Sequence, residues 1–480
     1  MSKKIKHSFF YLIPSFLGGL LTLVSLPLLT RVLSPEDYGF LALSQVYAIF
    51  LTGLANFGLT FSFERDFFEE RDKSKQAVLL YTIITFVSII LIIFGSLTFL
   101  FLDNILVFMN VKSRDVTDLF LLSFCSVSVT SIKNYFLIFY KNTENAKLFV
   151  WFTLDELIIN FVLSLLLVLY FKVGIEGIVI AQLFGGSLLL IILLYKFFRM
   201  KSFEISYFFL KRSLTLSLPL TPRIFFGIIG AQFDKYIIGI AGTVGNVGVY
   251  NIAQKIANMG YVFMSAIQNA WGPPVYKMMF DGNEINKKLI GQFLRPFYYC
   301  SIFVCLLIGV FSEEIIYILA PTDYGEGAII ISILSIMYGA QFFGKQNQLI
   351  FSKKTVLISV LTLSGIFFNI GLNYVVVFEW GFIGVAWATL ISSLLIGIIA
   401  YYFSQKSYTI IWPDYTLFIF LYFIFSVLVV VILIRSDLYY ETKVVLKIIL
   451  TLLYIFFGFA LKIISKQNLV TVYNIVFKKS

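Results

Sequence analysis

The sequence predicts an all-α membrane protein with about fourteen transmembrane helices. Hydrophobic residues make up 59% of the chain and charged residues 13%, with a mean hydropathy of +0.92. A soluble domain carries roughly a quarter charged residues, so lipid must be the main solvent here. Apolar runs recur along the whole chain and are long enough, at about 1.5 Å per residue, to cross a hydrocarbon core of about 30 Å.

The predicted spans follow one another with short connections. They begin near Phe9, Gly39, Ala77, Val116, Leu148, Ile175, Ser213, Val247, Phe293, Gly327, Val356, Phe382, Tyr415 and Val444. The longest connections, residues 196–212 and 101–115, are too short for a folded soluble domain. Function is therefore expected within the membrane. We expect the first span to remain as a helix, because it lacks a small-residue cleavage site.

Basic residues alternate between successive loops, which predicts the orientation. If the N-terminus is cytoplasmic, the cytoplasmic loops include Arg65, Arg71, Lys73, Lys75, Lys141, Lys147, Lys196, Arg199, Lys211, Arg212, Lys277, Lys287, Lys353 and Lys406. The opposite stretches GTVGNVG and EEIIYILAPTDYGEG contain no basic residue. Both termini are therefore predicted to be cytoplasmic. The net charge of +11 is explained by this asymmetry and by anionic lipid headgroups, so we predict no nucleic-acid partner.

Metal and disulfide chemistry find little support in the sequence. The cysteines Cys125, Cys300 and Cys305 lie in apolar segments, and the single histidine, His7, lies in the N-terminal tail. We therefore expect neither a disulfide framework nor a metal site.

Several segments recur about 210 residues apart. DYGFLALSQ resembles NVGVYNIAQ and pairs Gly39 with Gly248, while the stretches around Lys133 and Lys345 share their spacing of apolar and basic residues. An offset that spans six helices predicts two six-helix bundles as parallel repeats, related by an axis along the membrane normal. We predict lobes at residues 1–200 and 201–405, followed by two additional helices and a tail at 406–480.

Basic residues also occur inside the predicted spans, where insertion costs at least about 2.5–3.5 kcal/mol each. Such residues normally face water or protein. The candidates are Lys133, Arg223, Lys235, Lys255, Arg295 and Lys345. The acids inside the spans are Asp155, Glu156 and Asp234, which are candidates for coupling to H⁺ or Na⁺. Alternatively, Asp155 and Glu156 are counter-ions of Lys133, and Asp234 forms a neutral pair with Lys235.

Amides accompany these bases at helical spacing. Asn251, Gln254, Lys255 and Asn258 fall on one predicted helical face. A similar stripe is expected for Gln341, Lys345, Gln348 and Ser352, and a weaker one includes Gln45. These side chains would line a polar cavity, or would hydrogen-bond neighbouring helices together.

Two further features concern the ends of spans. Arg223 follows Pro219 and Pro222, which must break or bend the helix and expose backbone groups to a polar cavity or to neighbouring helices. Arg31 and Arg65 lie at span ends, where snorkelling to lipid headgroups competes with a place at the cavity mouth.

The residues LTRVLSPEDYG, from Leu29 to Gly39, and SLPLTPRIFFGIIGAQFDKYIIG resemble the bacterial polysaccharide or O-antigen flippases, the Wzx group of the multidrug/oligosaccharidyl-lipid/polysaccharide (MOP) superfamily. The resemblance covers essentially the whole chain. It implies a MATE-like fold that opens alternately to either side of the bacterial cytoplasmic membrane. It also implies a cationic central cavity. Arg31, Arg65, Arg223, Asp234 and Lys255 stand where members of this group often have functional charged residues, and the cavity role carries over to Arg223 and Lys255.

The implied cargo is a polyprenyl-diphosphate-linked oligosaccharide, flipped for surface polysaccharide synthesis. The implied partners are the lipid bilayer and, as candidates, a polysaccharide polymerase and chain-length machinery. A cation-coupled multidrug exporter is the alternative, although its cavity would be dominated by acids. A membrane polymerase is a third hypothesis, but no loop offers a catalytic motif or the necessary length. The chain has no Walker motif, and we predict a transporter without an enzymatic cofactor.

Overall fold

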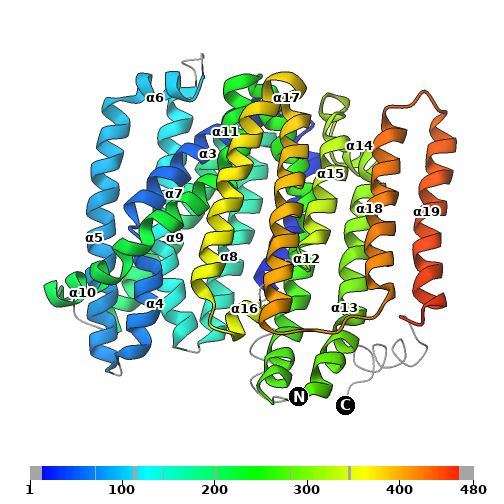
Figure 1. The fold of residues 1–480 in the computed structure, drawn as a ribbon. Coiled ribbons are helices and arrows are strands. Elements are labelled where there is room, and N and C mark those ends of the chain that lie inside the picture. The colour runs from blue at the N-terminus through cyan, green and yellow to red at the C-terminus, as the bar shows by residue number, and fades with distance from the viewer. Residues whose placement is uncertain are drawn as a thin grey trace. The chain divides into compact units, whose positions relative to one another are not determined.

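The computed structural model describes residues 13–70, 72–111, 116–143, 145–200, 203–281, 283–343 and 347–463. Regular structure in these ranges is entirely helical, as predicted (Figure 1). The chain packs into two compact units. The first comprises Met1–Asn251, Leu319–Asp323 and Asn373–Phe382, and the second comprises Ile252–Ile318, Tyr324–Leu372 and Ile383–Ser480. The repeat boundaries given above stay a prediction.

The first unit contains most of the N-terminal helices. They are α2 (Ile13–Leu29), α3 (Pro35–Ala55), α4 (Leu59–Glu69), α5 (Lys73–Leu100), α6 (Leu102–Phe108), α7 (Thr117–Asn142), α8 (Ala146–Leu165), α9 (Glu176–Met200), α10 (Tyr207–Ser217) and α11 (Thr221–Ala241). Helix α7 packs against α3, α5 and α9, and α8 packs against α2 and α9.

The second unit begins within the long helix α12. Its helices are α12 (Val244–Phe280), α13 (Glu284–Val310), α14 (Ser312–Leu319), α15 (Gly327–Ala340), α16 (Asn347–Phe351), α17 (Thr355–Ser407), α18 (Tyr415–Ile434) and α19 (Tyr440–Ala460). The middle of α17, Asn373–Phe382, belongs to the first unit. Helix α13 is central to this unit, because it packs against α15, α18 and α19.

Each of the fourteen predicted spans falls on a described helix. Ten helical stretches are long and apolar enough to span a membrane. One of them, α17, consists of two helices that meet at a non-helical residue, Gly381, where φ is +59°. The shorter apolar helices α2 and α15 and the polar α12 supply the remaining three segments. Because Gly381 lies directly before the predicted start at Phe382, the predicted boundary is confirmed.

The motif LSPEDYG forms the start of α3. The Ser34 hydroxyl accepts a hydrogen bond from the Asp37 amide at 3.2 Å, and the Ser34 amide donates to the Asp37 carboxylate at 2.8 Å. This reciprocal capping satisfies backbone donors that a helix start leaves unpaired. Pro35 occupies the first turn, where its missing N–H has no cost. The motif thus fixes where α3 begins.

The glycines paired by the sequence repeat contact each other's helix. A Cβ atom on Gly39 would lie 1.9 Å from the Val244 carbonyl oxygen, and one on Gly248 would lie 1.8 Å from the Pro35 carbonyl oxygen. Val244 and Gly248 follow Pro35 and Gly39 by the same 209 residues. The contact is therefore reciprocal, as expected of two copies related by an approximate twofold axis. Any side chain at either glycine would separate α3 from α12.

The prolines before Arg223 break the helix as predicted. Helix α10 ends at Ser217, Leu218–Leu220 form one 3₁₀ turn, and α11 begins at Thr221 with Pro222 in its first turn. Arg223 therefore lies in the first turn of a new helix.

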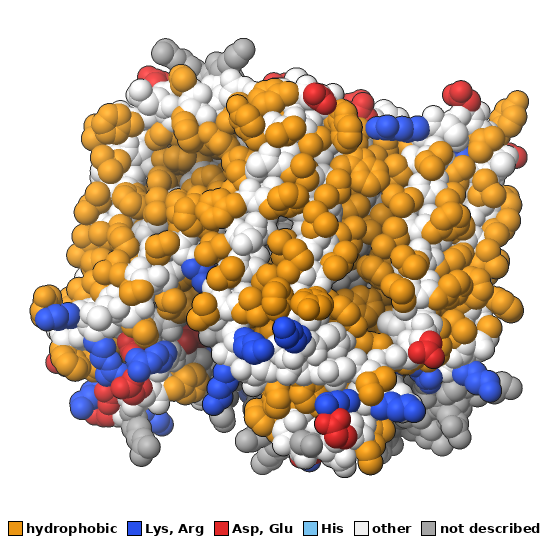
Figure 2. All heavy atoms as spheres, viewed as in Figure 1, with side chains coloured by type: hydrophobic (Ala, Val, Ile, Leu, Met, Phe, Trp, Pro, Cys, Tyr) orange, Lys and Arg blue, Asp and Glu red, His pale blue; other side chains and the backbone are white. Residues whose placement is uncertain are grey.

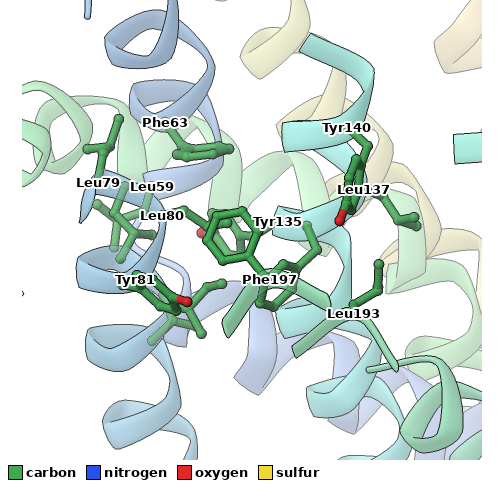
Figure 3. Close-up of a cluster of buried hydrophobic side chains, with 14 of the residues drawn as sticks. Leu59, Phe63, Leu79, Leu80, Tyr81, Tyr135, Leu137, Tyr140, Leu193 and Phe197 are labelled. Atoms are coloured by element: carbon green, nitrogen blue, oxygen red, sulfur yellow. The ribbon is translucent and has the colours of Figure 1, made fainter. Parts of the chain in front are cut away.

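The core of the first unit is rich in aromatic residues from α4, α5, α7 and α9 (Figure 3). The ring centroid of Phe197 lies 5.1 Å from that of Tyr81, 5.6 Å from that of Phe136 and 5.0 Å from that of Phe139. Such edge-to-face pairs add to the stabilisation that comes from burying the rings.

The outer faces of the helices are apolar. On α5, the exposed side chains include Ile89, Ile92, Leu97, Phe99 and Leu100. Figure 2 shows hydrophobic side chains along this helix, while charged side chains gather near α10 at one of its ends. An apolar face of this length suits contact with lipid chains, and the charged end suits the headgroup region.

Candidate substrate site

Lys133 on α7 is buried and forms an ion pair with Glu156 on α8. Only 4% of the lysine side chain and 12% of the glutamate side chain are exposed. Gly186 on α9 faces the pair, since a Cβ there would lie 3.8 Å from Glu156 Oε1 and 3.9 Å from Thr130 Oγ1. The counter-ion hypothesis for Glu156 is confirmed. Whether Lys133 also meets a substrate stays a prediction.

Asp155 and Arg223 have exposed side chains on helices predicted to cross the membrane. Asp155 precedes Glu156, but neighbours on a helix point about 100° apart, so one carboxylate is paired and the other faces outward. Asp155 lies nine residues after the first residue of α8, about 14 Å along the helix axis. Because a lipid-facing charge at this depth is costly, both side chains require a hydrated or polar neighbourhood.

Asp234 lies in a buried hydrogen-bonded cluster. Its carboxylate accepts hydrogen bonds from the Tyr250 hydroxyl at 2.9 Å and from Asn373 Nδ2 at 2.7 Å. The neighbouring Lys235 donates to Gln232 Oε1 at 3.2 Å. Asn373 was not among the predicted residues. Its contact could not be read from the sequence, because it lies 139 residues from Asp234.

The polar stripe around Lys255 lies on one continuous helix, α12. Asn251 is buried, and Gln254, Lys255 and Asn258 are half-buried. The predicted spacing on one helical face therefore holds. Gln45 on α3 is half-buried as well.

The prediction that Gln341, Lys345, Gln348 and Ser352 share one helical face is wrong. Helix α15 ends at Ala340, a turn contains Gln341, and α16 begins at Asn347. Gln348 is buried and donates to the Tyr408 carbonyl oxygen at 2.6 Å. Lys345 lies outside the described residues.

The arginines predicted at the cavity differ in their surroundings. Arg295 on α13 is half-buried and donates to the Tyr415 hydroxyl at 3.0 Å. Arg65 on α4 pairs with Asp66 at 3.0 Å and with Glu69 at 3.1 Å. Arg31 is exposed in the connection between α2 and α3.

A second group of charges links α4 to α10. Asp66 is 1% exposed, accepts a hydrogen bond from the Ser213 hydroxyl at 2.7 Å and lies 3.5 Å from an Arg212 nitrogen. Arg212 also pairs with Glu69 at 2.5 Å. This cluster fixes α10 against α4, and the sequence prediction did not include Asp66.

Sequence reasoning also missed Lys447, which is fully buried on α19. Its ammonium group lies 2.6 Å from Glu313 and 2.8 Å from Glu314, both in the first turn of α14. The lysine follows the predicted start of a span at Val444 by three residues, a place where a long basic side chain can also reach lipid headgroups. The pair of adjacent acids was the available signal, but the partner is more than 130 residues away.

A family model described as polysaccharide biosynthesis protein matches residues 5–279, more than half of the chain. The chain belongs to the polysaccharide biosynthesis protein family. The predicted family resemblance is confirmed. No curated protein matches the sequence at a significant level.

Solved structures share the fold of this polysaccharide biosynthesis protein at low sequence identity. The lipid II flippase MurJ in an inward closed conformation has a TM-score of 0.70 and 18% identity, covering 94% of this chain and 99% of MurJ. An inward-facing multidrug resistance MATE family transporter of the MOP superfamily has a TM-score of 0.60 and 17% identity, covering 82% and 97% of the two chains.

A third structure with this fold is a MOP superfamily transporter from Pyrococcus furiosus. It has a TM-score of 0.53 and 15% identity, covering 84% and 95% of the two chains, and its binding pocket is described as having reverse polarity. The predicted MATE-like, multi-pass fold is thereby confirmed, and it is a fold of membrane transporters.

Proposed function

We propose that this protein flips a polyprenyl-diphosphate-linked oligosaccharide from the cytoplasmic to the outer leaflet of a bacterial cytoplasmic membrane, for surface polysaccharide synthesis. Membership of a polysaccharide biosynthesis family and a fold shared with a lipid II flippase support this proposal. The observation that carries it is Arg223, an exposed guanidinium in the first turn of a helix inside a predicted span.

The chemistry of the cargo matches such a group. A diphosphate that crosses a low-dielectric slab needs cationic partners, and a guanidinium binds phosphate oxygens through two parallel hydrogen bonds. The break at Pro219 and Pro222 places Arg223 in the first turn of α11, inside a predicted span. Lys255 and its neighbouring amides would bind the remaining phosphate and sugar oxygens. Lys133, Lys345, Lys235 and Arg295 are further candidates for this role.

The test substitutes the two principal bases. Arg223→Ala or Lys255→Ala should abolish surface polymer while the protein stays in the membrane at normal abundance. Arg223→Lys is the matched control and should retain part of the function, since it keeps the charge but loses the bidentate geometry. Normal surface polymer in both alanine variants would refute the cationic site.

Transport against a gradient would need an energy source. We propose that Asp155, Glu156 or Asp234 couples flipping to H⁺ or Na⁺. The exposed carboxylate of Asp155 is the first to test, because Glu156 and Asp234 already have buried partners. Asp155→Asn should make flipping in proteoliposomes insensitive to an imposed ion gradient, and a retained gradient dependence would exclude this residue.

A multidrug exporter remains the second candidate, and the exposed Asp155 is the observation that favours it, since a carboxylate can bind a cationic drug. Drug resistance conferred by the wild type and lost in Asp155→Asn, with surface polymer unchanged, would support the exporter. We further propose that both termini are cytoplasmic and that a polymerase receives the flipped lipid.

A further inference from the structure

Helix α10 and residues 203–206 before it cover one end of α5. The Ser206 amide donates a hydrogen bond to Thr82 Oγ1 at 3.0 Å, and the ring centroid of Phe203 lies 5.1 Å from that of Tyr81. Figure 1 shows α10 crossing α5 instead of running alongside it, and α10 also packs against α4. Helix α11 alone has 21 residues, which is enough to cross the membrane, so α10 is not needed for that crossing.

The length of α5 indicates how deep this attachment lies. The helix has 28 residues and is therefore about 42 Å long, about 12 Å longer than the hydrocarbon core is thick. Phe99 and Leu100 in its last turn are 69% and 71% exposed, as suits contact with lipid chains, whereas Lys73 and Lys75 occupy its first turn. The excess length therefore protrudes at the end that the loop charges predict to be cytoplasmic. The edge of the hydrocarbon then falls about eight residues into α5, near Tyr81, where residues 203–206 attach.

The outward side of this segment is aromatic and basic. On the inward side of α10, Ser213 bonds to Asp66, and Arg212 pairs with Glu69. Lys211 is exposed and has no acidic partner within the described ranges. We call the exposed set the α10 patch, and it consists of Phe203, Ile205, Tyr207, Phe208 and Lys211. Tyr207 is 76% exposed and Phe208 is 67% exposed, so neither side chain is used for packing within the protein.

The depth and composition of the α10 patch match the boundary between lipid and water. Tyrosine is enriched at that boundary, and a lysine there extends its ammonium group toward the headgroups. Lysine is depleted at protein interfaces, which argues against a protein partner. The charges of Lys211 and of the exposed Arg199 at the end of α9 complement the anionic headgroups of a cytoplasmic leaflet. Glu204 is the single acid in residues 203–217.

We propose that the α10 patch binds anionic phospholipids of the cytoplasmic leaflet, with Tyr207 and Phe208 beside the upper acyl chains and the Lys211 ammonium group on a headgroup phosphate. The bound lipid holds α10 against α4 and α5 at the membrane surface. Because α10 leads through one 3₁₀ turn into α11, the same lipid fixes the corner that precedes Arg223. The consequence for transport rests on the proposed function: flipping is faster in a membrane that contains anionic lipid.

A depth measurement tests whether the patch lies at the lipid boundary. A nitroxide label is attached to Phe208→Cys or, as the control, to Lys75→Cys in the full-length protein. The exposed Cys125 and Cys300 are replaced by alanine, and Cys305, which is 1% exposed, stays unlabelled. Compared with the control, the label at Phe208→Cys should collide more often with dissolved oxygen, which concentrates among acyl chains, and less often with a water-soluble nickel complex. Equal collision with the nickel complex at both positions would place the patch in water, where it suits a soluble partner, and would overturn the proposal.

Hydrogen exchange tests the preference for anionic headgroups. In nanodiscs, the amides of α10 should exchange severalfold more slowly when phosphatidylglycerol replaces part of the phosphatidylcholine. Lys211→Gln should need about fivefold more phosphatidylglycerol for the same protection, as expected when one base near the surface is lost. Lys75→Gln removes an equal charge away from α10 and should behave like the wild type. Equal exchange of α10 in both membranes would overturn the proposal.

A flipping assay separates this inference from the proposed function. In proteoliposomes, Lys211→Gln should flip a polyprenyl-diphosphate-linked oligosaccharide severalfold more slowly than the wild type when phosphatidylglycerol is scarce, and at the wild-type rate when it is abundant. Rates that do not depend on phosphatidylglycerol would overturn the consequence for transport. If the wild type flips no lipid in either membrane, the proposed function fails, while label depth and hydrogen exchange still decide whether the patch binds anionic lipid.

Discussion

Lys133 in the first unit and Lys447 in the second are both buried lysines on predicted transmembrane helices, yet their surroundings differ. Lys133 has one partner, Glu156, which keeps 12% of its side chain exposed. Lys447 has two, Glu313 and Glu314, and its own side chain is fully enclosed. The first centre is neutral, and the second carries a net negative charge held at the N-terminus of α14.

This difference shows that buried bases in this chain can join helices through ion pairs. The Glu313 and Glu314 carboxylates benefit from the positive end of the α14 dipole, so their charge is stabilised where Lys447 meets them. The triad joins α19 to α14 and so fastens one of the two additional helices. Lys133 lies among α7, α8 and α9, where a neutral pair is easier to open toward a substrate.

The largest expected effect is that of Lys447→Met. The change leaves two buried carboxylates without their cation, which should lower the free energy of unfolding by about 3–5 kcal/mol. Thermal unfolding of the protein in detergent measures the loss. The control combines Lys447→Met with Glu313→Gln and Glu314→Gln, which should recover most of the stability. An unchanged melting temperature in the single variant would show that the triad is not formed.

Lys133→Met should have a smaller effect, about 3 kcal/mol, because the residual exposure of Glu156 lets water stabilise the remaining carboxylate. The double variant with Glu156→Gln should be nearly as stable as the wild type. The amount of surface polymer in cells that carry this double variant then tests whether the pair takes part in transport. Loss of polymer from this stable double variant would assign the Lys133–Glu156 pair to transport, whereas normal polymer would make the pair purely structural.

Asp66→Asn should weaken the attachment of α10 to α4 by about 1–3 kcal/mol. The asparagine keeps an acceptor for Ser213 but loses the charge that Arg65 and Arg212 neutralise. Faster hydrogen exchange confined to the amides of α10 is the expected signature. Ser213→Ala, which removes only one hydrogen bond, is the matched control, and equal exchange in all three proteins would contradict the role of Asp66.

The smallest effect is expected for Lys141→Ala. Lys141 and Glu64 lie 3.3 Å apart, but 53% and 39% of their side chains are exposed. Exposed pairs of this kind contribute about 0–1 kcal/mol. The melting temperature should therefore stay close to that of the wild type and should not respond to added salt. If Lys141→Ala lowered the free energy of unfolding as much as Lys133→Met does, burial would not determine how much these ion pairs contribute to stability.

Several local features were predictable because neighbours along the chain decide them. The break before Arg223 follows from the geometry of Pro219 and Pro222, and the division of α17 follows from Gly381. The repeat predicted that Gly39 and Gly248 are equivalent. The structure adds that each touches the carbonyl of the other's helix, a contact that spacing alone could not reveal.

The candidate site was less predictable. The helical face around Lys255 followed from spacing within one helix, whereas the expected stripe at Gln341 and Gln348 failed because α15 ends at Ala340 and Gln348 belongs to a separate helix, α16. Partners such as Asn373 for Asp234 or Lys447 for Glu313 join residues more than 130 positions apart. No periodicity along the chain encodes such a pairing.

The sequence by itself determined that this protein is a helical membrane protein, because hydropathy depends on the order of residues alone, and the spacing of its repeats predicted two related halves. Only the tertiary structure decided which charges are neutralised and which side chains face outward. Those properties depend on distances between helices, and a buried charge or donor is stable or costly according to the atoms that packing brings beside it.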